Sequence, residues 1–310
     1  MNIVSLFSGC GGMDLGFEGD FEFDGRYYDP HPFQIVWAND NDKYACETHA
    51  ANFSCSIHNS DIANIECDPI RLYPRSNIAV LIGGFPCQDF SVSGKRGGLN
   101  TKRGNLYRHF AKALYTIRPL VFVAENVPGL ISITNGTALE QIISEFAGCG
   151  YDTSYQILNA ADYGVPQLRR RLFFIGTMSG QPKFRFPIPT IPEDSWRTSG
   201  ETLSDLVDRA EDQAIKHVWS KASRNRGQGN KPIVKNRPSP TIRAEHHGNI
   251  EYHWTNKRRL SVREVARLQS FPDTFRFPCS MSESYRQVGN AVPPVVAWHL
   301  AKEIVKWMKT

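Results

Sequence analysis

The sequence predicts an α/β protein: a doubly wound, mostly parallel sheet with helices on both faces, joined to a smaller region rich in loops. Through residue 177, short apolar runs alternate with turn signals and helical stretches, which is the pattern of parallel strands connected by covering helices. From about residue 181, closely spaced prolines and glycines disfavour regular helices. The length of 310 residues suits two domains of ordinary size.

Each expected strand is a short apolar run that ends at a turn signal, and each expected helix has the spacing of one covered face. The strands are expected at residues 3–7, 35–38, 78–82, 120–124, 155–158 and 172–176. The helices between them are expected at residues 42–52, 106–117 and 138–147. Residues 19–34 form a small insertion before the second strand, and no function is assigned to them.

Two further helices are expected in the C-terminal part of the chain. Ser261 is followed three residues later by Glu264, a capping-box pattern that predicts a helix start, and this helix is expected to end near Ser270. Pro293 and its neighbour open an amphipathic helix that we expect to dock on the first domain. Its apolar face consists of Val296, Leu300, Ile304 and Trp307 or Met308.

The composition excludes several classes of protein. Hydrophobic residues make up 41% and charged residues 22% of the chain, as in globular proteins and unlike disordered, collagen-like or coiled-coil chains. No apolar run approaches the roughly 18 residues of a membrane helix, and the N-terminus lacks the charged region of a signal peptide. The seven cysteines are an odd number without a CxxC spacing, which favours neither a disulfide framework nor a metal site. We therefore expect a cytoplasmic protein that contacts no membrane and binds no metal.

Positive charge is concentrated in one segment. Residues 216–263 contain twelve Lys or Arg and only two Glu, a net charge of +10, whereas the whole chain carries +5. A basic segment of this kind is typical of a surface that meets a polyanion, although a merely solvated basic surface is equally compatible with the charge count.

Glycine and acidic residues follow the first strands, where a doubly wound sheet binds nucleotide-like ligands. Residues 7–12 (FSGCGG) come after the first strand and open the first helix, and their glycines let the backbone approach a ligand closely. Asp40 ends the second strand, where its carboxylate would accept hydrogen bonds from ribose hydroxyls. Asp61, after the next apolar stretch, is a candidate adenine contact.

A cysteine and a glutamate follow the next two strands. Cys87 stands on a proline-fixed turn, residues 83–91 (GGFPCQDFS), and the loop after it carries cations that would lower the pKa of a nearby thiol. Glu125 ends the following strand, so parallel neighbours would bring it close to Cys87. A carboxyl group at the dry end of an apolar strand should have a raised pKa and act as a proton donor. Taken alone, such a glutamate is more often a helix cap or an ion-pair partner.

Two arginines precede the last strand. Residues 167–171 (QLRRR) place Arg169 and Arg171 on the same side of an extended chain. Guanidinium groups that face the cysteine would hold an anionic backbone and fix the glutamate and a base carbonyl. A solvated charge run is the simpler interpretation of this segment by itself.

These segments, in this order, resemble the DNA (cytosine-5)-methyltransferases of bacterial modification systems. The resemblance spans residues 2–177 and 258–296, and it implies the Rossmann-like fold of S-adenosylmethionine (SAM)-dependent methyltransferases. Residues 183–257 resemble the variable target-recognition domain, and we expect a catalytic domain at 1–182 with 283–310 and a recognition domain with hinge at 183–282. The distinctive motifs are residues 7–12, 84–88 (GFPCQ), 125–127 (ENV), 167–171, 259–272 (RLSVREVARLQSFP) and 287–293 (QVGNAVP).

The resemblance implies transfer of a methyl group from SAM to carbon 5 of a specific cytosine in double-stranded DNA, within a restriction–modification system. The Cys87 thiolate would add to C6 of a base flipped out of the duplex, and Glu125 would protonate or hydrogen-bond N3 and the exocyclic amine. Arg169 is implied to assist at the pyrimidine O2, and Arg171 to anchor the catalytic loop.

The resemblance also implies the binding residues, and we expect a monomer that binds double-stranded DNA. The SAM contacts are Phe7, which stacks on adenine, with Gly9, Gly11, Asp40, Asp61, Ile62, Pro86, Leu106 and Asn290. The DNA contacts are expected from Ser91, Lys95, Arg96, Arg224, Arg226, Arg237 and Arg243. Asn41 follows Asp40 where the family often has Trp, so Ile62 is expected to carry more of the adenine packing.

Other interpretations stay open. The stripe of Arg259, Arg263 and Arg267 would either line the DNA cleft or form interdomain ion pairs. A tRNA cytosine-5 methyltransferase shares the catalytic core, but its Cys-Phe-Thr element is absent. A catalytically silent DNA-binding regulator would not need the complete set of catalytic residues. A nicotinamide-dependent dehydrogenase shares the pattern of a strand, glycines and the acidic residue Asp40. Its function gives no reason for the Pro-Cys turn or for residues 167–171.

Overall fold

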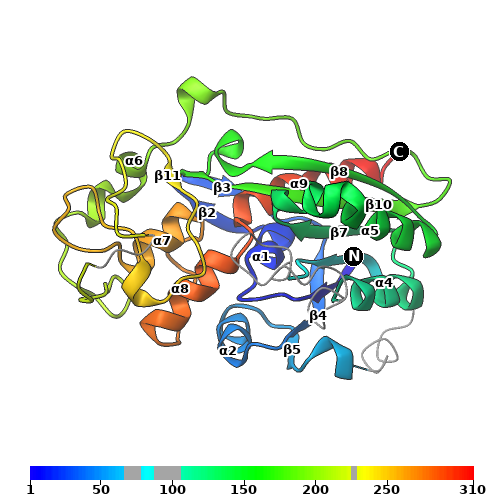
Figure 1. The fold of residues 1–310 in the computed structure, drawn as a ribbon, viewed down its shortest axis with the longest axis horizontal. Coiled ribbons are helices and arrows are strands. Elements are labelled where there is room, and N and C mark those ends of the chain that lie inside the picture. The colour runs from blue at the N-terminus through cyan, green and yellow to red at the C-terminus, as the bar shows by residue number, and fades with distance from the viewer. Residues whose placement is uncertain (66–77, 87–105, 225–228) are drawn as a thin grey trace.

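The computed structural model describes residues 1–65, 78–86, 106–224 and 229–310, and its centre is a seven-stranded sheet (Figure 1). The strand order is β5-β4-β1-β6-β7-β10-β8. Neighbouring strands are parallel except at β10, which runs antiparallel to both β7 and β8. The strands are β1 (Asn2–Leu6), β4 (Gln34–Asp40), β5 (Ser56–Asn59), β6 (Ile78–Gly83), β7 (Val121–Asn126), β8 (Tyr151–Asn159) and β10 (Arg170–Met178). The expected mostly parallel α/β fold is confirmed.

Strand β5 was not expected from the sequence. Its four residues, SIHN, contain a single apolar side chain, Ile57, and none of the four is buried. β5 lies at the edge of the sheet and pairs with β4 through its backbone. It has no apolar run from which a strand could be predicted.

Side chains alternate between two cores, one on each face of the sheet. In β1, Ile3 belongs to the core under α1 (Gly12–Glu18) and α9 (Pro294–Trp307), whereas Val4 belongs to the core under α4 (Leu106–Ile117) and α5 (Thr137–Gly148). Helix α2 (Lys43–Asn52) follows β4 and contacts β4 and β5. This double covering explains the continuous apolar runs of β6 and β7.

The C-terminal helix α9 docks on the first domain, as expected. Val296, Leu300 and Ile304 are buried in the same core as Phe17 of α1. The amphipathic spacing of the sequence was therefore a correct guide to both the helix and its packing face.

The insertion at residues 19–34 is a β-hairpin of β2 (Phe21–Phe23) and β3 (Arg26–Tyr28). The Phe21 and Tyr28 rings stack at 4.9 Å, and Tyr28 packs edge-on against Trp298 of α9 at 5.3 Å. At the hairpin tip, Asp24 pairs with Arg197 of the loop-rich region, residues 183–282, which is called the second region below. The insertion therefore packs on the core of the sheet and contacts the second region.

The second region has its own core, beside the sheet (Figure 1). Between residues 181 and 260 its regular elements are short, as the prolines and glycines predicted, and include α6 (Ser199–Leu203) and β11 (Ser239–Pro240). Helices α7 (Val262–Leu268) and α8 (Met281–Asn290) pack on the same core. β11 pairs with β9 (Gln167–Leu168), the extended segment just before β10. The capping box at the start of α7 is confirmed, with Ser261 as N-cap and Glu264 at the third helical position.

Among the described residues, none of the helices has both the length and the apolar character needed to cross a bilayer.

Candidate active site

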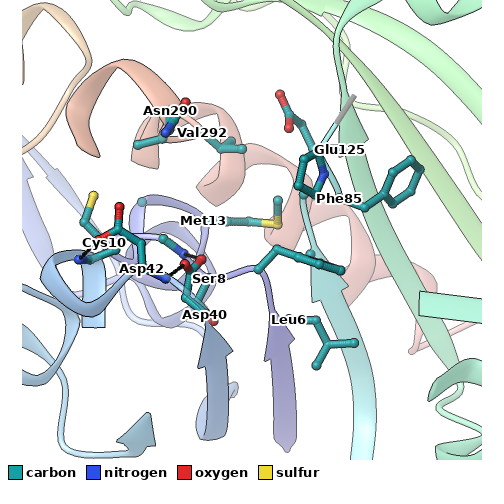
Figure 2. A pocket seen from close by; sticks show the side chains of 18 of the residues that line it. Leu6, Ser8, Cys10, Met13, Asp40, Asp42, Phe85, Glu125, Asn290 and Val292 are labelled. Carbon is teal, nitrogen blue, oxygen red and sulfur yellow. Dashed lines mark hydrogen bonds between the residues drawn. The ribbon is translucent and has the colours of Figure 1, made fainter. Parts of the chain in front are cut away.

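A cavity of about 510 Å³ lies at the carboxyl edge of β1, β4, β6 and β7. Figure 2 shows Asp40 and Glu125 reaching it from separate strands, while Asn290 and Val292 form a further side. Residues far apart in the sequence thus share one site. Of those expected from the sequence, its lining includes Phe7, Gly9, Asp40, Asp61, Ile62, Pro86, Leu106, Glu125, Arg169, Arg171 and Asn290.

The turn after β1 is shaped by residues with positive φ: Phe7 at 53°, Gly9 at 56° and Gly11 at 93°. A Cβ at Gly9 would meet no atom within 4 Å, so this backbone borders open space. Gly11 does not line the cavity, because it faces the opposite way and a Cβ there would lie 2.2 Å from the Phe53 ring. Gly11 therefore shapes the turn as N-cap of α1, whereas Gly9 offers backbone to a ligand.

Asp40 anchors this turn through both carboxylate oxygens. Oδ2 accepts a hydrogen bond from Gly9 N at 2.8 Å, and Oδ1 accepts one from Asp42 N at 2.8 Å. Burial raises the pKa of Asp40, and the two backbone hydrogen bonds oppose that shift. Each carboxylate oxygen has a second lone pair, so the group is still able to accept hydroxyl donors from the cavity.

Glu125 and Arg171 form an ion pair at the cavity wall. Nε of Arg171 lies 2.9 Å from Oε1 of Glu125, and their side chains are 17% and 13% exposed. The pair forms because β10 runs antiparallel to β7, with Leu172 opposite Asn126. Burial raises the pKa of Glu125, in the direction expected from the sequence, while the positive charges of Arg171 and Arg169 act against the shift.

Arg169 is anchored to backbone carbonyls around the cavity. It is 1% exposed, and its terminal nitrogens donate to backbone carbonyls: Nη1 to Ile242 at 2.8 Å, and Nη2 to Gly289 and Ala291, both at 2.9 Å. Both arginines line the cavity, but they have different hydrogen-bond partners. Arg169 binds backbone at the junction with the second region, and only Arg171 pairs with Glu125.

Cys87, Ser91, Lys95, Arg96 and Arg226 lie outside the described residues. The chain before Cys87 is described up to Pro86, which lines the cavity. Phe85 O accepts a hydrogen bond from Asn126 Nδ2 at 3.1 Å, and a Cβ at Gly84 would lie 3.0 Å from Oε2 of Glu125. Gly84, three positions before Cys87 in the sequence, therefore lies directly beside Glu125.

The basic segment divides into internal and external charges. Arg224 and Arg237 are exposed, and Arg243, partly exposed, lies 3.9 Å from Glu251. Arg259 and Arg263 are only 1% and 2% exposed. The net charge of the segment therefore overstates the charge that a partner would meet.

The expected arginine stripe on α7 is corrected by these contacts. Nη1 of Arg259 donates to Ile250 O at 2.6 Å, and Nη1 of Arg263 donates to Pro272 O at 2.9 Å. Arg267 pairs with Asp205 and Asp273. These arginines neither line a DNA cleft nor pair with the first domain, because each is used to bind loops within the second region.

Polar residues of the site that were not expected include Arg286 and Asp14. Arg286 lines the cavity from α8, with Nη2 at 3.1 Å from Oδ2 of Asp42. Its position one helical turn before Asn290 was a usable signal, because residues four apart share a helix face. Asp14 is fully buried, accepts a hydrogen bond from Ser5 Oγ at 2.7 Å and lies 2.7 Å from His49 Nε2. No spacing in the sequence announces that contact, since it joins two different helices.

Comparison with known proteins identifies the family. The family model for C-5 cytosine-specific DNA methylase matches residues 1–233 and 193–306. The Type II methyltransferase M.NgoFVII of Neisseria gonorrhoeae is 36% identical over 335 residues, which cover 98% of this chain and 86% of that protein. The Type II methyltransferase M.BsuRI of Bacillus subtilis is 34% identical over 99% of this chain and 80% of that protein.

Solved structures support the fold. The crystal structure of the S. pombe Dnmt2 methyltransferase aligns with a TM-score of 0.73 at 17% sequence identity and covers 100% of both chains. At that identity the likeness concerns the fold alone. Together, the family match and the near full-length relatives show that the chain belongs to the C-5 cytosine-specific DNA methylase family and is a DNA cytosine-5 methyltransferase, an enzyme that requires a methyl donor.

Proposed function

We propose that the protein methylates carbon 5 of one specific cytosine in double-stranded DNA, with SAM as donor, as the modification enzyme of a restriction–modification system. The observation that carries the proposal is the position of Glu125. Paired with Arg171 and next to the turn that leads to Cys87, it borders the same cavity as the glycine turn and Asp40. The Type II methyltransferases among the relatives support the biological setting.

The cavity residues fit SAM. Phe7, Ile62 and Leu106 offer apolar surface for an adenine ring, and Asp40 has acceptor capacity for ribose hydroxyls. Gly9 leaves open space where a side chain would otherwise obstruct the ligand. Asn41 also lines the cavity. The family often has a Trp ring at this position, so the side chain here is polar instead of aromatic. When bound, SAM would supply an electrophilic methyl group.

The chain's own residues would make the cytosine reactive. The Cys87 thiolate would add to C6, so that a new sulfur–carbon bond forms and C5 gains the character of an enamine carbon. Glu125 would donate a proton to N3 as that bond forms. After C5 has been methylated, loss of the C5 proton and expulsion of the thiolate would restore the aromatic ring. Because C6 is hidden inside a duplex, the base would enter the cavity flipped out.

The contacts of the two arginines lead to different roles from those the resemblance implied. Arg171 would orient Glu125 and provide the guanidinium nearest to the base, because its Nε already binds that carboxylate. Arg169 would hold the backbone at the junction between the two regions, since Nη1 and Nη2 bind three carbonyls. We therefore include in the proposal that Arg171, and not Arg169, acts at the base.

Residues 183–282 would recognise the target sequence, against a catalytic domain of residues 1–182 and 283–310. Arg224, Arg237 and Arg243 would meet DNA together with Arg226, and Ser91, Lys95 and Arg96 would contact it from the loop after Cys87. Phosphate contacts of this kind fix the register of a protein on the duplex, while contacts to base edges select the sequence. We expect a monomer acting on DNA in the cytoplasm, at the nucleoid.

Bisulfite sequencing of plasmid DNA from cells that express the protein tests this function. One protected cytosine in a fixed sequence context is expected, and Cys87→Ser should abolish the protection while retaining DNA binding. Incubation with labelled SAM and either duplex DNA or tRNA separates the two nucleic acids. Label in tRNA alone would overturn the proposal, and normal turnover by Cys87→Ser would overturn the choice of nucleophile.

A further inference from the structure

A closed ring of hydrogen bonds lies behind the active-site cavity. Ile242 N donates to Gln167 Oε1 at 2.9 Å, Gln167 Nε2 donates to Gln269 Oε1 at 2.6 Å, and Gln269 Nε2 donates to Ala291 O. Arg169 completes the circuit, because it donates to both Ala291 O and Ile242 O. The ring therefore joins backbone on two sides through three side chains from β9, the loop before β10 and the end of α7.

The three side chains of the ring are shielded from solvent. Gln167 and Gln269 are fully buried, and Arg169 is 1% exposed. Buried amides must have their donors and acceptors matched, so each glutamine can point in only one direction. With both amides oriented, the ring has one hydrogen-bonding arrangement.

One side of the ring is the segment expected to meet DNA. Ile242 directly precedes Arg243, and the residues before it are held on β9 as well. Thr241 Oγ1 donates to Leu168 O at 2.6 Å, and Ser239 N donates to Pro166 O at 2.9 Å. The segment that carries Arg243 is thus attached to the catalytic sheet through β9.

The other side is the cavity wall. Ala291 follows Asn290, and Arg169 binds the carbonyls of Gly289 and Ala291, one on each side of Asn290. The two sides also touch directly, since a Cβ at Gly289 would lie 2.2 Å from Arg243 O. The backbone of residue 243 therefore contacts the segment that supports Asn290.

We propose that this ring couples DNA recognition to cofactor binding, and that Gln269 is a positioning residue of the reaction. The proposal rests on the function proposed above. DNA bound at the recognition segment would fix Ile242, the ring would fix Ala291, and Asn290 would be set for the cofactor. Linkage is reciprocal, so a cofactor that orders Asn290 must in turn favour the DNA-binding arrangement.

Gln269 is the residue at which this coupling is best tested. Neither Gln167 nor Gln269 lines the cavity, so neither touches the reacting atoms. A Gln269→Met variant removes the link yet leaves the other members with partners. Gln167 Nε2 keeps Leu268 O at 2.9 Å, and Ala291 O keeps Arg169. The variant is therefore expected to fold.

The experiment uses the full chain and measures its Kd for an unmethylated duplex that contains the target sequence found by bisulfite sequencing. The Kd is measured with and without S-adenosylhomocysteine. We expect this cofactor product to tighten DNA binding by about fivefold or more in the unmodified protein and by less than about twofold in Gln269→Met. Ile142→Val is the control, because it reduces packing in the core under α4 and α5, which contains no member of the ring. That variant should retain the full coupling.

A second variant guards against a loss of fold. Gln269→Leu removes both the acceptor for Gln167 and the donor to Ala291 O with a side chain of similar volume, so it should also lose coupling while circular dichroism reports a folded chain. Unchanged coupling in either folded variant would overturn the inference. So would the absence of any tightening in an unmodified protein that methylates DNA. A protein that neither methylates nor binds DNA would instead overturn the proposed function.

Discussion

Nε of Arg171 lies 2.9 Å from Oε1 of Glu125, across the antiparallel pairing of β10 with β7. The two residues are 46 positions apart in the sequence, and they meet because β10 enters the sheet from the edge at which β7 ends. A partly buried carboxyl group is thereby held in one orientation beside the turn that leads to Cys87. Burial raises the pKa of Glu125 and the contact with Arg171 opposes that shift, and two predictions depend on this balance.

The first prediction concerns protonation of Glu125. Burial raises the pKa of this group, and the proposed chemistry uses its protonated form. On the alkaline side of the pH–rate profile, methyl transfer should therefore decline as the pH rises through the pKa of Glu125. Glu125→Gln keeps a hydrogen-bond donor but cannot deliver a proton, so the single-turnover rate should fall by about 100-fold or more and lose this alkaline decline. If the Glu125→Gln variant kept the alkaline decline, the decline would belong to another group.

The second prediction concerns Arg171. Its positive charge lowers the pKa of Glu125, so Arg171→Gln should move the alkaline decline of the rate to higher pH. The rate itself should also fall, because Glu125 loses its orienting partner. Arg170→Gln is the matched control, since the side chain of Arg170 is exposed and its pH profile should stay unchanged. Identical profiles for the two variants would contradict the role given to the ion pair.

The third prediction concerns Asp40 and the cofactor. In Asp40→Asn, one of the two oxygens that accept Gly9 N and Asp42 N becomes an amide donor and the negative charge is lost. We expect S-adenosylhomocysteine to bind about tenfold more weakly, measured by isothermal calorimetry. Asp152→Asn, at an exposed position outside the cavity, should bind it normally. Equal affinity in both variants would remove Asp40 from the cofactor site.

The fourth prediction separates the internal arginines from the external ones. Arg263 donates to the carbonyls of Ile215, Pro272 and Phe275, and its removal leaves three buried acceptors without that donor. Arg263→Met should lower the free energy of unfolding by about 3 kcal/mol in urea titrations. Arg237→Met, at an exposed position, should change it by less than about 0.5 kcal/mol. A stable Arg263→Met variant would argue against a structural role.

The fifth prediction concerns DNA affinity and salt. Binding should weaken steeply as salt increases, because phosphate contacts release counterions. Arg224 is exposed, with its guanidinium carbon 4.1 Å from the centre of the Tyr252 ring. Arg224→Ala should reduce the slope of log affinity against log salt by about one, with little change in thermal stability. A slope that is flat in the unmodified protein would remove the phosphate-binding role of the basic segment.

Local patterns were sufficient for most of the architecture. The helix start at Ser261, the docking face of α9 and the strands β1, β4, β6 and β7 follow from side-chain spacing and capping chemistry, which act over a few residues. The edge strand β5 and the hairpin at residues 19–34 were not foreseen as such. Backbone pairing and distant partners such as Trp298 stabilise them, and neither leaves a local signal.

The sequence by itself determined the family, the glycine turn and the carboxylates at the strand ends, because each follows from a short motif or from the end of an apolar strand. The placement of Cys87 on a proline-fixed turn stays a prediction. Only the tertiary structure decided which arginine meets Glu125, that Arg259 and Arg263 are internal, and that Gln167, Gln269 and Arg169 form a ring. The physical reason is the nature of their partners. Arg259, Arg263 and Arg169 bind backbone carbonyls of other segments. Every residue has a backbone carbonyl, so no side-chain pattern in the sequence predicts these contacts.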